Sequence, residues 1–331
     1  MQAHTLVMPP LGPENKSEIA VARGIQLKTE TTIAKSIKCM TCWKEQKCCV
    51  CEAVRRLFDD ERRGKWRAGA LRMRIFVYLS KEEWLCGGNS GRLLGLLFPR
   101  ETTFYVHGMR SESERLRADM FASKAGRLCV LFPGADALTV PEWLARQDSA
   151  DAAEDRVSVD DAAARDPAAA AATGGAPASD EPAGAIKKAG DDPGILGVLL
   201  VDGTWDQARR MAKYLRKALL PSLPHTTLTL TGLQRLSVFR RKQSQEGRVC
   251  TSEALALFLS EVLAAKAEAC TLSDEVASAA AEACTEVVSE AIQLNNRALM
   301  PLGKKVFWQG DGGHPAWYFG EKLVKGKGTC W

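Results

Sequence analysis

Four residues that could take part in chemistry, Asp202-Gly203-Thr204-Trp205, follow a short apolar run and precede a strongly basic segment. An acidic side chain at the carboxyl end of a buried strand lies where α/β sheets bind ligands. Asp202 could serve as a general base or hold a cationic group of a ligand, and Gly203 allows a sharp turn. Trp205 either lines a ligand pocket or packs on the core, and the sequence alone leaves both interpretations open.

A cysteine cluster near the N-terminus has the composition of a metal site. Cys39 and Cys42 form a Cys-x2-Cys pair, and Cys49 and Cys51 form a Cys-x-Cys pair. Four thiolates at this spacing suit a tetrahedral structural zinc ion. Cys48 is a competing third ligand, so the choice between Cys48 and Cys49 stays open. A redox pair is less favoured, because a redox Cys-x-x-Cys motif normally begins a helix next to a strand.

Three further stretches are candidates for the same site. The segment LFPG at residues 131–134 ends a strand in a turn, so we expect it to open onto the same sheet edge as Asp202. The segment GGNSG at residues 87–91 leads into a helix whose N–H groups suit an anion. Thr251 and Glu253 lie in the first turn of another predicted helix.

Hydrophobic patterning indicates the elements that position these residues. We expect strands at residues 71–79, 103–108, 127–134, 197–201 and 225–230, and helices at residues 90–98, at 251–269 and from there to about 299. Thr204 and Gln207 have the spacing of a capping box, which begins a helix with a basic face. The continuous apolar strand at 197–201 is typical of a parallel sheet that is covered on both faces. Strands that alternate with helices predict an α/β domain.

Composition divides the chain of 331 residues into segments. Residues 148–194 are rich in Ala, Asp, Gly and Pro and lack aromatic side chains, which predicts a disordered acidic insertion. The predicted organisation in chain order is a flexible N-terminus (1–36), a four-cysteine zinc-binding segment (37–56), the first part of the α/β domain (70–147), the insertion (148–194), and the second part with C-terminal helices and tail (195–331).

The net charge of +5 is unevenly distributed. Residues 141–194 hold twelve acidic and five basic residues, and residues 251–291 hold eight and one, so the rest of the chain is strongly cationic. Such a surface favours a nucleic-acid partner.

The sequence shows no apolar run of membrane-spanning length and no secretory signal pattern. We therefore expect no membrane association, a location in the cytoplasm or nucleus, and mostly reduced cysteines. No pattern indicates an oligomeric state.

The motifs together resemble the DTW-domain family of tRNA-uridine aminocarboxypropyltransferases. They are the cysteine cluster, the NSG loop, LFPG, DGTW and the Arg-Arg-Lys…TSEA segment, which span about residues 37–260 in the family's order. The chain has Ser90 and Cys250 where the family commonly has threonine and serine. The Arg-Pro pair usual between the cysteine pairs is absent. A His-Pro-x-Glu-like element is reduced to Leu79-Ser80-Lys81-Glu82, which leaves Glu82 without a clear match.

The resemblance implies a SPOUT-related knotted α/β fold, S-adenosylmethionine as donor, structural Zn2+ and tRNA as substrate. The implied reaction transfers the 3-amino-3-carboxypropyl group of the donor to N3 of a uridine and releases methylthioadenosine. The alternatives are a zinc-dependent RNA-binding module without catalysis and a SPOUT-type RNA methyltransferase.

These considerations assign three sets of residues. The candidate catalytic residues are Asp202, Thr204 and Trp205. The candidate donor-binding residues are Asn89, Ser90, Gly91, Phe132, Pro133, Gly134, Leu200, Val201, Gly203, Arg209, Thr251 and Glu253. The candidate RNA-binding residues are Arg240, Arg241, Lys242, Lys213, Arg216 and Lys217.

Overall fold

The computed structural model of the chain describes residues 16–35, 37–58, 60–69, 71–122, 127–146, 195–228 and 249–299. It also describes the backbone of three short strands nearer the C-terminus, which pair antiparallel: β7 (Lys305–Trp308), β8 (Ala316–Phe319) and β9 (Lys322–Leu323). The predicted disordered insertion at 148–194 and the basic run Arg240-Arg241-Lys242 lie outside the described residues.

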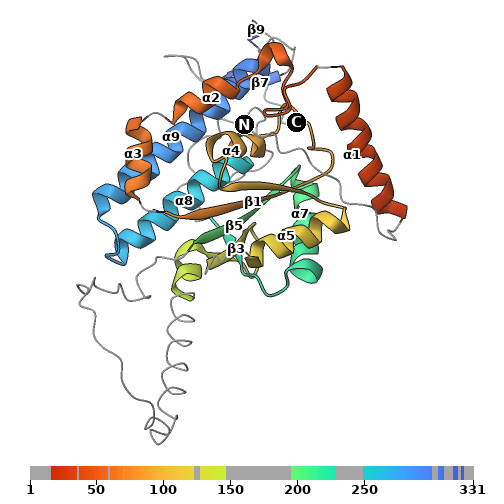
Figure 1. Ribbon diagram of the computed structural model, residues 1–331. Coiled ribbons are helices and arrows are strands. Elements are labelled where there is room, and N and C mark those ends of the chain that lie inside the picture. Colours follow the sequence, from red (N-terminus) through yellow and green to blue (C-terminus); the bar gives the residue numbers. More distant parts are fainter. Residues whose placement is uncertain are drawn as a thin grey trace, which may run out of the picture.

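A six-stranded parallel sheet forms the centre of the domain (Figure 1), with the strand order β2-β1-β5-β3-β6-β4. Its strands are β1 (Met73–Leu79), β2 (Thr102–Val106), β3 (Arg127–Leu131), β4 (Leu138–Thr139), β5 (Leu196–Asp202) and β6 (His225–Thr227). The predicted α/β class is therefore confirmed, whereas the SPOUT-related knot stays a prediction.

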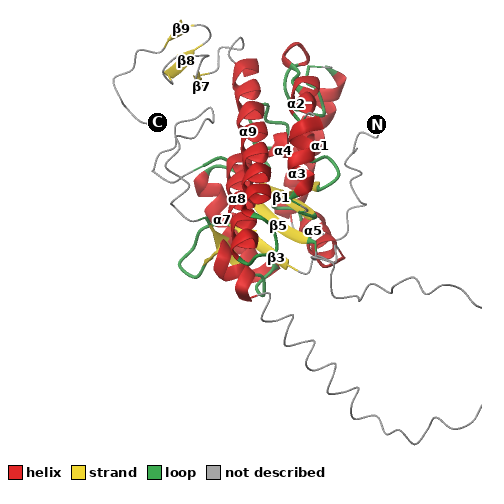
Figure 2. Ribbon diagram, turned by 90° about the vertical axis from the view of Figure 1, so that its left-hand side faces the viewer, coloured by secondary structure: helices red, strands yellow, loops and turns green. Residues whose placement is uncertain are grey.

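Helices cover both faces of this sheet, as the turned view shows (Figure 2). Alternate side chains of β5 point to opposite faces. Val198 and Leu200 join one buried cluster, to which α2 (Cys51–Leu57), α4 (Gly91–Leu97), α8 (Thr251–Glu268) and α9 (Asp274–Leu299) also contribute. Leu199 joins the cluster on the other face, with α5 (Arg110–Ala122) and α7 (Trp205–Tyr214). Helix α3 (Asp60–Ala68) packs on α9.

Parallel pairing brings the carboxyl ends of the strands to one edge of the sheet. Leu79 of β1 pairs with both Asp202 of β5 and Val106 of β2, and Leu131 of β3 pairs with Leu200 of β5. The segments that follow β1, β3 and β5 therefore leave the sheet side by side. This is the edge at which α/β sheets hold their ligands.

Helix α1 (Lys16–Ala34) occupies most of the segment for which we expected a flexible N-terminus. Its Ala22 and Ile25 are buried against Trp43, Trp84 and Leu85. The helix is thus stabilised by partners far along the chain, which its own weak apolar periodicity does not reveal. Residues 16–34 differ from the expectation in this respect, and residues 1–15 lie outside the described part.

The remaining predicted elements are present with small shifts of their ends. The helices expected at 90–98 and 251–269 are α4 and α8, and the Ala-rich helix that follows is α9. In the part of the chain that the structure describes, no helix combines the length and the apolar character needed to cross a membrane.

Candidate active site and cysteine centre

The Asp202 carboxylate is buried where β5, α4 and α8 meet, with only 4% of the residue exposed. The side-chain amide of Asn89 donates to Asp202 Oδ2 at 2.5 Å, and the Thr251 hydroxyl donates to Asp202 Oδ1. Asp202 follows Leu200 by two residues, so its side chain points to the face that α4 and α8 cover. Three predicted site residues from distant parts of the sequence therefore meet at one carboxylate.

Gly91 brings the first turn of α4 against this carboxylate. A Cβ at position 91 would lie 2.9 Å from Asp202 Oδ2, which is closer than normal packing allows. The carbonyl of Ser90 accepts a hydrogen bond from the Ser252 hydroxyl at 2.5 Å, which joins the start of α4 to the start of α8. The glycine of the NSG motif is thus required here for space.

Replacing Gly91 with alanine is expected to displace the Asp202 carboxylate and to lower the free energy of unfolding by about 1–3 kcal/mol, the usual result of overpacking. Gly64→Ala in α3 is the matched control, because a Cβ there meets nothing within 4 Å and alanine favours a helix. Urea-induced unfolding of the two variants measures the difference. Equal stability of Gly91→Ala and the native protein would contradict the packing described above.

Burial raises the pKa of Asp202 to about 6, and the negative charge of Glu83 adds to the increase. The hydrogen bonds from Thr251 and Asn89 oppose this shift in pKa, since they favour the carboxylate form. At neutral pH the group is therefore still mostly ionised but more basic than an ordinary aspartate. A general base requires this state.

Two glutamates follow β1 at this edge of the sheet. Glu83 contacts the groups around Asp202, and Glu82 contacts the start of α7. The sequence motifs left Glu82 without a clear match and did not point to Glu83. Asn89 Nδ2 donates to Glu83 Oε2 at 3.1 Å, so this amide bridges Glu83 and Asp202. Glu82 accepts hydrogen bonds from Ser80 at 2.7 Å and from Gln207 at 3.3 Å. Their position directly after a strand could have predicted a place near Asp202, because neighbouring parallel strands end at the same edge of a sheet.

Helix α7 begins with the predicted capping box. Thr204 Oγ1 accepts from the Gln207 N–H, and the Gln207 side chain accepts from the Thr204 N–H at 2.8 Å. The Thr204 hydroxyl, which we expected among the catalytic groups, thus caps the helix. Gly203 leaves room for this arrangement, since a Cβ there would lie 3.1 Å from Gln207 Oε1.

The aromatic candidates lie on the other side of the same edge. Trp205 and Phe132 form a ring pair with centroids 5.8 Å apart. Phe132 and Val201 pack against the cluster under α5 and α7, whereas Leu200 faces α4 and α8 with the Asp202 carboxylate. The structure therefore places the carboxylate and the aromatic pair on opposite faces of the sheet, close to its carboxyl edge.

The turn after β3 contacts a predicted RNA-binding cation. Gly134 lies so close to the Arg216 guanidinium that a side chain at position 134 would displace it, and Pro133 and Gly134 are exposed. Arg216 Nη1 pairs with Asp136 Oδ1 at 2.7 Å, so its charge is partly neutralised within the protein.

The other candidate residues are found at helix surfaces and helix starts. Lys213 of α7 and Lys217 of the π-helical turn that follows (Leu215–Leu219) are exposed. Arg209 is also exposed, and its guanidinium pairs with the carboxylate of Asp206. Glu253 accepts from the N–H of Cys250 at 2.8 Å and so helps to begin α8.

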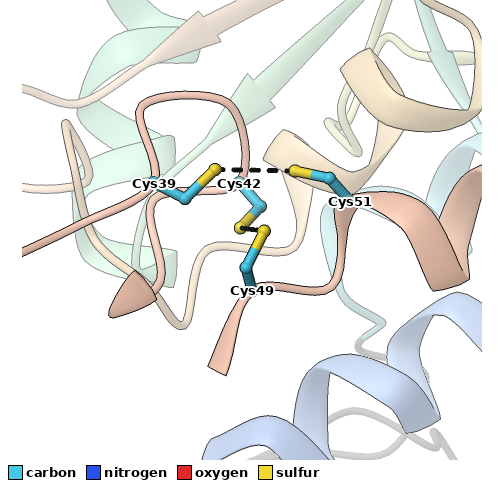
Figure 3. Close-up of side chains that lie close together, drawn as sticks. All are labelled: Cys39, Cys42, Cys49 and Cys51. Carbon is cyan, nitrogen blue, oxygen red and sulfur yellow. Dashed lines mark hydrogen bonds between the residues drawn. The ribbon is translucent and has the colours of Figure 1, made fainter. Parts of the chain in front are cut away.

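Four cysteine side chains form a compact centre beside the sheet (Figure 3). The Sγ atoms of Cys39, Cys42, Cys49 and Cys51 all lie within 4.8 Å of one another. The Cys39–Cys51 and Cys42–Cys49 distances between sulfur atoms are 3.6 Å and 3.8 Å. Sulfur ligands at about 2.3 Å from zinc stand about 3.8 Å apart in a tetrahedron, so the cluster fits this ion. Cys48 lies outside the cluster, which favours Cys49 as the third ligand.

Two buried cations lie beside this centre. Hydrogen bonding with Cys51 lowers the pKa of the Cys42 thiol to about 4, whereas burial raises the pKa of Cys49 and hydrogen bonding with Cys42 raises that of Cys51. Lys44 is 1% exposed, and Arg92 is mostly buried with its guanidinium 4.9 Å from the centre of the Trp43 ring. A tetrathiolate zinc site carries a net negative charge, which these two buried cations would offset.

The fold and the two centres define an α/β protein with a candidate ligand site at the carboxyl edge of a parallel sheet and a four-cysteine centre beside it. A family model described as the DTW domain matches residues 36–281, which is most of the chain, so the chain belongs to the DTW-domain family. No curated protein and no solved structure matches the chain. Membership of this family supports a tRNA-modifying function and an enzyme of the transferase type.

Proposed function

We propose that this protein is a tRNA-uridine aminocarboxypropyltransferase. It would transfer the 3-amino-3-carboxypropyl group of S-adenosylmethionine to N3 of a uridine in tRNA. The observation that carries this proposal is the buried, abnormally basic Asp202 carboxylate inside a DTW domain. The reaction needs such a group, because the imide N–H of uridine is weakly acidic and must lose its proton.

The bound donor would supply an electrophilic γ-carbon next to a sulfonium. N3 forms a bond to that carbon, the carbon–sulfur bond breaks, and the sulfur keeps the electron pair as methylthioadenosine leaves. Asp202 takes the proton from N3, and Asn89 and Thr251 hold its two oxygens in place. Holding N3 of the uridine in line with the carbon–sulfur bond, with the base within reach of its proton, supplies much of the rate increase.

The donor-binding residues of the proposal come from four segments, namely those at the ends of β1, β3 and β5 and the start of α8. The Phe132-Pro133-Gly134 turn and Trp205 would contact the adenosine, and the Asn89-Ser90-Gly91 turn with Arg209 would bind the donor carboxylate. The pairing of β3 with β5 supports this assignment, because it places the Phe132 turn next to the backbone of Leu200 and Val201. Thr251 and Glu253 complete the site at the start of α8.

The tRNA partner of the proposal is supported by exposed cations beside this edge. Lys213 of α7 and Lys217 of the π-helical turn that follows are exposed. The run Arg240-Arg241-Lys242, which lies outside the described residues, stays a candidate from the sequence. Contacts of lysine and arginine with phosphates orient a nucleic acid but do not choose the base. The choice of uridine is therefore assigned to the Asp202 site.

Release of methylthioadenosine in the presence of S-adenosylmethionine and unmodified tRNA tests the proposal. We expect release that requires both the protein and the tRNA. Salt-sensitive tRNA binding without consumption of the donor would identify an RNA-binding module instead. Release of S-adenosylhomocysteine would identify a methyltransferase. Either result would overturn the proposed reaction.

A competing role for Asp202 is to hold the donor's ammonium group. In that case Asp202→Asn would mainly weaken the binding of S-adenosylmethionine, which isothermal titration calorimetry measures directly. Proton transfer predicts a loss of turnover with nearly unchanged donor affinity.

Transfer activity is expected to fall as the pH decreases through about 6, because protonation of Asp202 removes the base. Thr251→Val removes a hydrogen bond that favours the carboxylate, so it should raise the pKa of Asp202 further and move the loss of activity to higher pH. Thr251→Ser retains the hydroxyl and is the matched control. Profiles of kcat/KM against pH decide the matter, and an unshifted profile for Thr251→Val would refute this role.

A further inference from the structure

The loop between β1 and α4, residues 80–90, carries two of the groups around Asp202. Glu83 and Asn89 both belong to it, and the amide of Asn89 links the two carboxylates. The loop contains Leu85 at φ 57°, in the left-handed region that side chains such as leucine rarely adopt. An unusual backbone conformation persists only where its surroundings impose it. The segments around this loop must therefore hold it in place.

Three lysines from the N-terminal segment donate to backbone carbonyls of the β1–α4 loop. Lys28 of α1 donates to the carbonyl of Trp84. Lys38 donates to the carbonyl of Leu85 at 2.6 Å, and Lys44 donates to the carbonyl of Gly87 at 3.0 Å. Lys38 and Lys44 lie on either side of the first cysteine pair in the chain, so both belong to the segment that carries the cysteine centre.

Arg92 joins the cysteine segment to the first turn of α4. Its Nε donates to the carbonyl of Thr41 at 2.5 Å, between Cys39 and Cys42 in the chain. Its guanidinium lies over two rings, 4.9 Å from the centre of Trp43 and 4.8 Å from that of Phe104. The backbone N–H of Arg92 donates to Asn89 Oδ1 at 2.8 Å. One residue therefore contacts both the cysteine segment and the amide that bonds Asp202.

The loop also lies in direct contact with the cysteine segment. A Cβ at Gly87 would stand 3.0 Å from the carbonyl oxygen of Trp43. The Trp43 and Trp84 rings pack with centroids 5.1 Å apart, and the Trp84 indole N–H donates to Thr29 of α1 at 3.0 Å. Polar and apolar contacts thus join the same two segments.

We propose that the metal-bound cysteine segment is a clamp that positions the β1–α4 loop, with Arg92 as its main positioning residue. By fixing Asn89, the clamp keeps the Asp202 carboxylate within hydrogen-bonding distance of the Asn89 amide and so fixes its orientation. Its effect on catalysis rests on the proposed function, whereas its effect on the loop does not. The cysteine centre acts through protein contacts in this proposal, and not as a docking site for RNA.

Hydrogen exchange of the full-length, zinc-loaded protein tests the clamp without any assay of activity. In Arg92→Ala, backbone amides of residues 80–92 should exchange about tenfold faster, the scale expected when a hydrogen bond from a charged group is lost. Arg115→Ala is the matched control, because Arg115 also donates to a backbone carbonyl, that of Phe104 at 2.8 Å, and lies over a ring, 4.3 Å from the centre of Tyr105. Its exchange should rise around β2 and α5 and not in residues 80–92.

Lys38→Met provides a second variant in case Arg92→Ala does not fold, and it should accelerate exchange around Leu85. Unchanged exchange in residues 80–92 for the folded variants would overturn the clamp. Weaker tRNA binding with unchanged exchange would also overturn it, in favour of RNA docking.

Where the native protein transfers the aminocarboxypropyl group, Arg92→Ala should lower kcat about tenfold at unchanged tRNA affinity. Faster exchange in a protein that lacks transfer activity would support the clamp and refute the proposed function.

Discussion

Replacing Asp202 with asparagine is expected to lower aminocarboxypropyl transfer about 10³-fold while it makes the protein more stable at neutral pH. The loss of activity follows from the loss of the base. The substitution keeps the size of the side chain, and both hydrogen bonds can persist. The new amide oxygen accepts from Asn89, and the new NH2 group donates to the hydroxyl of Thr251, which can rotate to accept.

The gain in stability follows from the direction of the pKa shift. Folding raises the pKa of Asp202 from 3.8 to about 6, so the folded state disfavours the ionised carboxyl. Below both pKa values the residue is protonated in the folded and unfolded states and no penalty exists. The penalty grows as the pH rises from about 4 to 6 and then stays constant at about 3 kcal/mol for a shift of about two pKa units. Asparagine never ionises and avoids it.

Urea-induced unfolding at about pH 4 and pH 8 measures this effect, since the stability difference between variant and native protein should appear only at the higher pH. Asp274→Asn is the control, because Asp274 is an exposed acid in the first turn of α9 and lies outside the proposed site. It should change neither the activity nor the pH dependence of stability. A difference in stability that is the same at both pH values would show that Asp202 is not the buried acid of raised pKa described above.

Replacing Cys49 with serine is expected to remove the bound zinc and to lower the free energy of unfolding by about 3 kcal/mol or more, because structural zinc sites contribute directly to folding. Cys49 is exposed and contributes little to the core, so the loss of packing alone would be small. The four sulfur atoms within 4.8 Å make each of them necessary for a tetrahedral site.

Cys48→Ser is the control for this prediction, since Cys48 is the chain neighbour of Cys49 but lies outside the cluster. It should retain one zinc per chain and the native stability. Metal content by atomic absorption and thermal unfolding of both variants provide the comparison. Retention of zinc by Cys49→Ser together with its loss from Cys48→Ser would contradict the ligand set.

Local rules in the sequence predicted several parts of the site correctly. The Thr204-x-x-Gln207 spacing predicted the capping box of α7, and the apolar run before Asp202 predicted a buried parallel strand. Both depend on neighbours in the chain and on simple periodicity, which a sequence displays directly. The ordered motifs of the DTW-domain family supplied Asn89 and Thr251, whose contacts with Asp202 no periodicity could predict.

Other parts depend on contacts between distant segments, and the sequence alone could not predict them. Glu83 is significant only because β1 pairs with β5, and Arg92 only because the cysteine segment lies against α4. The amphipathic pattern of α1 is too weak to predict its burial, which depends on contacts with Trp43 and Leu85. Spacing alone could not distinguish Cys48 from Cys49, because both satisfy the ligand separations of structural zinc sites.

The fate of isotopic label from S-adenosylmethionine tests the central claim most directly. Unmodified tRNA is incubated with the protein and with donor labelled either in the carboxyl carbon or in the S-methyl group, and the label in the RNA is measured. Our account predicts that the carboxyl label enters the tRNA, that the methyl label leaves in methylthioadenosine, and that Asp202→Asn lowers both about 10³-fold. Transfer of the methyl label to the tRNA, or full transfer of the carboxyl label by Asp202→Asn, would contradict it.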